Sequence, residues 1–169
     1  MFTSGFQEGQ SASENRRLIN STENFDLYHT ILYYLYTGII VFDTAPDNFD
    51  PTDNAPQAID VHTIYDAADR FLLPDLKQKA FNFLRKTCTA DNITSRVFGE
   101  CASLHEELTK YYDSYFEENI QSVLESSDYK KFFDEEESWP TEKRVDINTK
   151  LRALMEDGMK RLKRRRVDY

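Results

Sequence analysis

The sequence predicts an α+β fold that is predominantly helical and contains short strands. Apolar residues recur at steps of three and four along most of the 169 residues, which is the spacing of one face of an α-helix. Apolar residues make up 40% of the chain and aromatic residues 14%, enough to form a buried core. Residues 39–42 have the branched composition of a short strand, and residues 16–20 are expected to form another.

The first half of the chain predicts helices separated by an acidic loop. One helix begins at Phe25 and ends at Gly38, because glycine tolerates the left-handed conformation that closes many helices. Residues 43–57 hold three prolines and four aspartates and read as an exposed loop. Asp60 can cap the next helix, and Pro74 ends that helix and suits the first turn of another. In the helix from Phe25, the apolar residues Phe25, Tyr28, Leu32, Leu35 and Tyr36 have Ile31 and Tyr34 beside them, as on a helix buried around much of its surface. The apolar face of the helix before Pro74 is expected to comprise Val61, Ile64, Tyr65, Ala68, Phe71 and Leu72.

The second half predicts further helices that finish in a basic end. Asp91 is placed to cap a helix that runs on to Leu104, and a second pattern continues from Leu108 to Leu124. Residues 134–140 resemble an acidic linker, and an amphipathic helix with Ile147, Leu151, Leu154, Met155, Met159 and Leu162 follows.

Three segments, in order, resemble the BTB/POZ family. They are residues 1–8, residues 32–38 (LYYLYTG) and residues 64–76 (IYDAADRFLLPDL). The resemblance implies a partial BTB/POZ domain over residues 1–87 that lacks the family's first strands and helix. Residues 88–133 are similar to the helical extension of speckle-type adaptors, and residues 134–169 form the acidic linker, amphipathic helix and basic tail. Because the missing elements supply much of the family's dimer surface, the resemblance leaves a homodimer open.

The resemblance also implies a function in protein interaction. Phe6 and Glu8 fall where cullin-binding members of the family carry a hydrophobic-x-Glu motif, and Phe71 would add contact area on the same face. The expectation is an adaptor that recruits a cullin-type ubiquitin ligase scaffold. The alternative is a scaffold or transcription-associated oligomerisation module without ligase function, since the sequence shows no kelch or MATH receptor unit.

Catalysis, cofactors and metals are not expected. The sequence has no phosphate-binding glycine loop, GxSxG turn, HExxH motif or CxxC pair. His29, His62 and His105 are far apart on predicted helices, and Cys88 and Cys101 read as small hydrophobic residues. The longest apolar run, residues 31–42, is too short to cross a bilayer, so no membrane span is expected.

The charge is divided between an acidic body and a basic end. The net charge is −9, and residues 159–169 carry +5, so residues 1–158 carry −14. The run Lys160, Arg161, Lys163, Arg164, Arg165 and Arg166 matches a nuclear import signal, which predicts a nuclear or nucleocytoplasmic protein. The alternative is the solvated end of an amphipathic helix, where positive charge suits the helix dipole. Nucleic-acid binding is not expected, because the acidic body repels phosphates.

Overall fold

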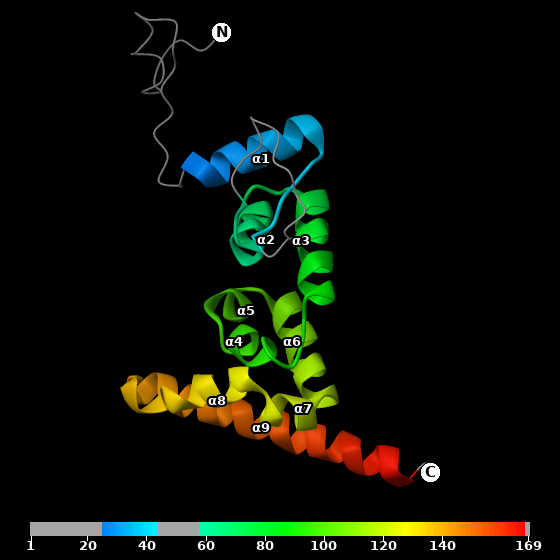
Figure 1. Ribbon diagram of the computed structural model, residues 1–169, viewed down its shortest axis with the longest axis vertical. Coiled ribbons are helices and arrows are strands. Elements are labelled where there is room, and N and C mark those ends of the chain that lie inside the picture. The colour runs from blue at the N-terminus through cyan, green and yellow to red at the C-terminus, as the bar shows by residue number, and fades with distance from the viewer. Residues whose placement is uncertain (1–24, 44–57, 168–169) are drawn as a thin grey trace, which may run out of the picture. The chain divides into compact units, whose positions relative to one another are not determined.

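The structure is a computed structural model that describes residues 25–43 and 58–167, without the side chains of Glu137 and residues 165–167. Within these ranges the chain is predominantly helical, as the sequence predicts (Figure 1). It divides into two compact units, Met1–Asp60 and Val61–Tyr169. None of the helices in the described ranges is long and apolar enough to cross a membrane.

The prediction of a strand at residues 39–42 is wrong. Gly38 ends the preceding helix with φ of +71°, and its backbone N–H donates to the Tyr34 carbonyl at 2.7 Å. Phe42 then forms one isolated parallel bridge with Ile59, and no strand occurs in the described ranges. Branched residues favour extended backbone, but a strand also needs a neighbouring strand that continues the ladder. The other expected strand, residues 16–20, lies outside the described residues.

Helix α1, Phe25–Thr37, begins and ends as the sequence predicts, but it is buried on one side only and not around much of its surface. Its buried residues are Leu27, Thr30 and Ile31. Several of the residues expected to be buried are exposed: Phe25, Leu32, Leu35 and Tyr36 are 76%, 50%, 55% and 88% accessible. Apolar side chains surround most of this helix, so their spacing does not select one buried side.

Helices α2, Val61–Arg70, and α3, Pro74–Lys86, pack against each other in the second unit. As predicted, Pro74 occupies the first turn of α3, where its missing N–H has no helical partner to lose. The predicted apolar residues Val61, Ile64, Tyr65 and Ala68 are buried in α2. Leu76, Ala80 and Leu84 are buried in α3.

The prediction of one helix from Asp91 to Leu104 is wrong, because the chain forms two short helices there. These are α4, Ile93–Val97, and α5, Glu100–Leu104, with Phe98 and Gly99 between them. A Cβ on Gly99 would lie 2.8 Å from the Ser95 carbonyl oxygen, so this close turn requires glycine. Ile93 and Val97 are buried as expected, whereas Leu104 is 66% exposed.

Asp91 does not cap α4, which corrects a second expectation. Its Oδ1 accepts from the backbone N–H of Ser127 at 3.2 Å, at the start of α8, Ser127–Asp134. Asp128 of α8 in turn accepts from the Ser95 backbone N–H at 3.0 Å in α4. Asp91, just before α4, therefore bonds the first turn of α8, and Asp128 bonds the first turn of α4. Ser126 is the local cap of α8 and accepts from the Tyr129 N–H at 3.1 Å.

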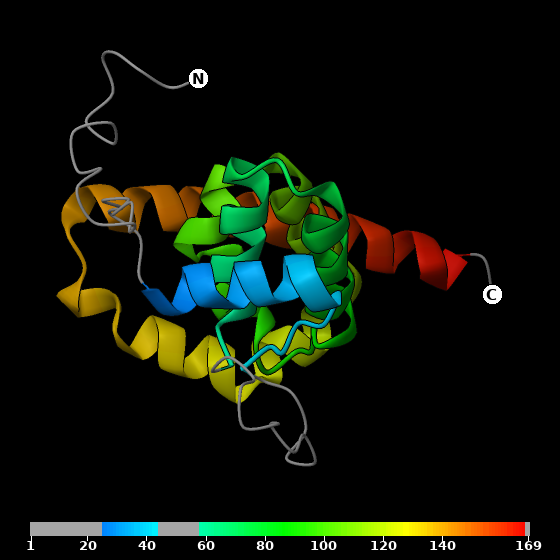
Figure 2. The same cartoon turned by 90° about the horizontal axis from the view of Figure 1, so that it is seen from above.

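The remaining helices complete the second unit. They are α6, Glu106–Glu118, α7, Ile120–Glu125, the short 3₁₀ helix η2, Glu136–Ser138, and α9, Thr141–Val167. Leu108, Tyr112, Phe116, Ile120 and Val123 are buried as their spacing predicts. Helix α9 packs on α6 and α7, and its C-terminal end extends beyond the other helices of this unit (Figures 1 and 2). The expected acidic linker contains η2, and Trp139 packs there on Phe132, with ring centroids 4.8 Å apart.

Candidate protein-interaction site

The turn between α2 and α3 exposes apolar side chains. Leu72 is 84% accessible and adopts φ of +56°, in the left-handed region that glycine usually occupies. The Leu73 N–H donates to the Ala68 carbonyl at 2.8 Å, and the Leu72 N–H donates to the Asp69 carbonyl at 3.1 Å. This is the Schellman pattern of helix termination, with leucine where glycine is preferred. The apolar spacing predicts Leu72 on a buried face, whereas the structure exposes it.

Phe71 lies beside Leu72 and is 37% exposed. The Arg70 guanidinium lies 6.0 Å from the Phe71 ring centroid and pairs with Asp66 at 3.0 Å between Nε and Oδ2. Phe71 is predicted to bind a partner, and it lies partly exposed at the surface of the second unit. Phe6 and Glu8, the other predicted partner-binding residues, lie outside the described residues.

Hydrogen bonds and ion pairs connect the end of α2, next to the turn, to neighbouring elements. Lys77 of α3 donates to Asp69 of α2 at 2.6 Å, and this hydrogen bond keeps the pKa of the Asp69 carboxyl below its ordinary value. His105, which connects α5 and α6, lies 3.2 Å from Asp66 between Nε2 and Oδ1 and 3.8 Å from Asp69 between Nδ1 and Oδ2. The end of α2 is therefore tied both to α3 and to the α5–α6 connection. The exposed turn therefore follows a helix end that these polar contacts hold in place.

The ionisable side chains nearby connect helices. The Tyr65 hydroxyl donates to Glu107 at 3.0 Å; burial and then this hydrogen bond raise the pKa of Tyr65. His62 Nε2 lies 3.1 Å from the Tyr112 hydroxyl, and Cys101 Sγ contacts the His62 carbonyl at 3.8 Å. Burial raises the pKa of the Cys88 thiol, which disfavours the nucleophilic thiolate. Across residues 25–43 and 58–167, no group of three metal-binding side chains comes together.

The predicted import signal forms part of helix α9, where two of its cations are paired. Lys160 pairs with Asp157 at 2.8 Å, and Arg161 reaches Glu117 of α6 at 2.8 Å and Glu118 at 3.2 Å. Lys163 and Arg164 are exposed. Arg165 and Arg166 continue the helix, although the structure does not describe their side chains.

The first unit carries a separate exposed apolar face on α1. Phe25, Leu32, Leu35 and Tyr36 lie on it, and Ile39 just beyond the helix is 49% exposed. Asp26 is the only acidic residue of α1, and this helix contains no lysine or arginine. Together these side chains form an exposed apolar patch, a feature that often marks an interaction surface.

Comparisons with models of known protein families, with curated proteins and with solved structures found no match to this chain.

Proposed function

We propose that this chain is a protein-interaction module that acts as an adaptor and recruits a cullin-type ubiquitin ligase scaffold. The observation that carries the proposal is the exposure of Leu72, at 84%, in a left-handed conformation beside Phe71. A leucine in this conformation costs about 1–2 kcal/mol relative to glycine. A residue with a strained backbone and an exposed side chain contributes little to the stability of the fold. A partner that covers the Leu72 side chain therefore explains this residue better than packing within the fold does.

The chemistry of the turn suits a docking anchor. Burying a leucine or phenylalanine side chain fully stabilises a complex by about 1.5–3 kcal/mol. Apolar anchors of binding interfaces are commonly surrounded by polar groups that exclude water, and here Asp69, Arg70 and Lys77 flank the apolar pair. Because the contacts of Asp66 and Asp69 with Lys77 and His105 already order the end of α2, binding at the turn would lose little conformational entropy.

The resemblance to the BTB/POZ family supports the choice of partner. In that resemblance Phe6 fills an apolar pocket on the cullin, and Glu8 makes polar contacts with the same scaffold. Phe71 adds contact area to this interface. The second unit would then contribute the α2–α3 turn, and its remaining helices would enlarge the surface offered to the scaffold.

The test measures the affinity of the full chain for the N-terminal region of a cullin by calorimetry. Leu72→Gly removes the side chain while suiting the left-handed conformation, so we expect unchanged or higher thermal stability and about tenfold weaker binding. Phe71→Ala should weaken binding to a similar extent. Leu104→Ala is the matched control, because Leu104 is an exposed leucine of the same unit at 66%. Absence of cullin binding by the unaltered chain, or equal affinity in all variants, would refute the proposal.

The alternative function is a scaffold or transcription-associated oligomerisation module, and the exposed face of α1 favours it. A helix with so little charge can pair with a second copy without electrostatic repulsion along the contact. Sedimentation that shows a dimer abolished by Tyr36→Asp, with no cullin binding, would support this function. Co-purification separates the two in cells, since ubiquitin ligase subunits indicate the adaptor and chromatin factors indicate the scaffold.

A further inference from the structure

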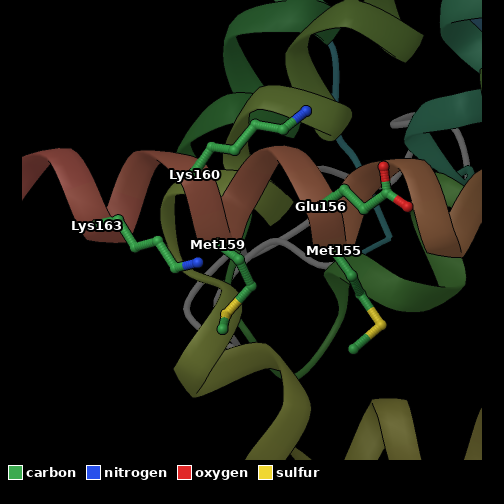
Figure 3. Close-up of a pocket in the computed structure, with 5 residues that line it drawn as sticks. All are labelled: Met155, Glu156, Met159, Lys160 and Lys163. Carbon is green, nitrogen blue, oxygen red and sulfur yellow. The ribbon is translucent and has the colours of Figure 1, made fainter.

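Helix α9 carries a second apolar feature of the second unit, distinct from the α2–α3 turn. Met155 and Met159, one helical turn apart, line a hollow of about 420 Å³ together with Glu156, Lys160 and Lys163. Figure 3 shows both methionine side chains pointing to the same side of α9, with the Lys163 side chain on that side as well. Met159 is 50% exposed, and Met155 is half-buried. Methionine adapts its shape readily and is common at surfaces that bind apolar side chains.

The neighbouring face of α9 is held firmly in place. A Cβ on Gly158 would lie 2.9 Å from Ile120 Cδ1 and 3.1 Å from the Glu117 carbonyl oxygen, so the helix backbone sits directly on α6 and α7. Arg161 pairs with Glu117 and Glu118 from the same side. The two methionines therefore lie beside an ordered contact, and their backbone needs no rearrangement to receive a partner.

Lys163 and Arg164 place exposed positive charge next to the methionines. In the part of the chain that the structure describes, no carboxylate lies within ion-pair distance of Lys163 or Arg164, and both are exposed. Two carboxylates near this end of α9 are already engaged, since Asp157 pairs with Lys160 and Glu117 with Arg161, whereas Glu156 is exposed at the edge of the hollow. An apolar strip with free cations at its C-terminal end is complementary to apolar residues accompanied by acidic ones.

We propose that the Met155–Met159–Lys163 surface of α9 binds an acidic amphipathic helix of a partner protein. Leucine or phenylalanine side chains of that helix enter the hollow between the methionines, and its aspartates or glutamates pair with Lys163 and Arg164. A nucleic acid fits this surface less well. The hollow is lined by thioethers and contains no aromatic ring among its lining residues on which a base could stack.

The test uses the full chain and a short fluorescein-labelled peptide with Leu and Phe on one helical face and Asp and Glu on the other. Binding is followed by fluorescence anisotropy. We expect Met159→Ala to weaken binding about fivefold and Lys163→Glu about tenfold. Lys110→Glu is the charge control, because Lys110 is exposed on α6 of the same unit. Leu72→Gly should leave this binding unchanged, which separates the surface from the proposed cullin contact.

Two further probes decide the chemistry. A peptide of identical composition, rearranged so that apolar and acidic residues mix on every face, should bind at least about fivefold more weakly. A labelled single-stranded oligonucleotide should bind more weakly than the amphipathic peptide. Equal binding of both peptides, no effect of Met159→Ala, or tighter binding of the oligonucleotide would each overturn the proposal.

Discussion

At the scale of single residues, Tyr65 shows how a polar group takes part in the core. Its side chain is fully buried, and its ring meets the His105 ring edge-on with centroids 5.0 Å apart. The hydroxyl still reaches Glu107 at 3.0 Å. Burial, followed by the hydrogen bond to Glu107, raises the pKa of Tyr65 above its ordinary value of 10.0. The folded protein therefore favours the neutral phenol.

This pKa shift predicts a loss of stability in alkali. Because the pKa is raised in the folded state, the contribution of Tyr65 is complete below pH 10 and is lost as the pH rises towards the folded pKa. Tyr65→Phe should cost about 1–2 kcal/mol of unfolding free energy at neutral pH, where it removes the hydrogen bond to Glu107. Above pH 10 the difference between variant and parent should shrink. Urea unfolding at neutral and alkaline pH measures both effects.

Tyr36→Phe is the matched control for this prediction. Tyr36 is 88% exposed, so the same chemical change there should alter neither the stability nor its dependence on pH. Tyr112, whose pKa burial also raises, keeps some alkaline sensitivity in the Tyr65 variant. A constant difference between Tyr65→Phe and the parent at all pH values would contradict the assignment.

At the scale of elements, the short helices depend on one another. Helix α4 has five residues and α8 has eight, lengths at which an isolated helix does not persist in water. Asp91 accepts from the N–H of Ser127, and Asp128 accepts from the N–H and hydroxyl of Ser95. Phe98, just after α4, stacks on Phe132 of α8 with centroids 5.3 Å apart. Each helix is thus stabilised at its first turn by the other.

Removal of the carboxylate of either Asp91 or Asp128 should destabilise both helices. We expect Asp128→Ala and Asp91→Ala each to lower the free energy of unfolding by about 1 kcal/mol, the usual cost of a lost helix cap. The double variant should lose less than the two single losses combined, because the caps support one contact. Asp146→Ala, an exposed aspartate of α9, is the control and should change stability by less than about 0.5 kcal/mol. Additive losses in denaturant unfolding would argue against a shared unit.

At the scale of the whole molecule, charge separates the basic end from the acidic body. The net charge of −9 combines +5 in residues 159–169 with −14 in residues 1–158. Part of the basic end is engaged with the body, since Arg161 pairs with Glu117 and Glu118. An import receptor that reads this run would have to compete with these ion pairs. Within the described residues, Lys163 and Arg164 form no ion pair, and both are exposed.

The nuclear import prediction can be tested apart from folding of the body. Residues 143–169 are fused to a fluorescent carrier too large to diffuse through nuclear pores, and nuclear accumulation is expected. Replacement of Lys160, Arg161 and Lys163 by alanine should abolish it, because import receptors bind such runs through acidic grooves. Met159→Ala in the same fusion should have no effect, which distinguishes import from the proposed peptide contact. Equal cytoplasmic signal in the unaltered and triple-alanine fusions would refute a sufficient import signal.

Local patterns predicted much of the fold correctly. Gly38 ends α1 and Pro74 starts α3, because both residues restrict or permit backbone angles through their own covalent structure. The spacing of Leu108, Tyr112 and Phe116 identified the buried face of α6, where apolar and polar residues separate cleanly. Phe71 was predicted to bind a partner through the resemblance, and this stays a prediction. Leu72 was assigned to the core, and the structure exposes it.

The sequence by itself determined the helical character of this protein, the positions of its strongest helix boundaries and the separation of its charges. These properties depend on side chains within a few residues of each other or on composition alone. Tertiary structure decided which face of α1 is buried, where Phe98 and Gly99 interrupt a helix, and which helices Asp91 and Asp128 cap. It also decided that Leu72 is exposed. Each of these depends on groups distant in the chain or on a turn geometry that apolar spacing does not encode.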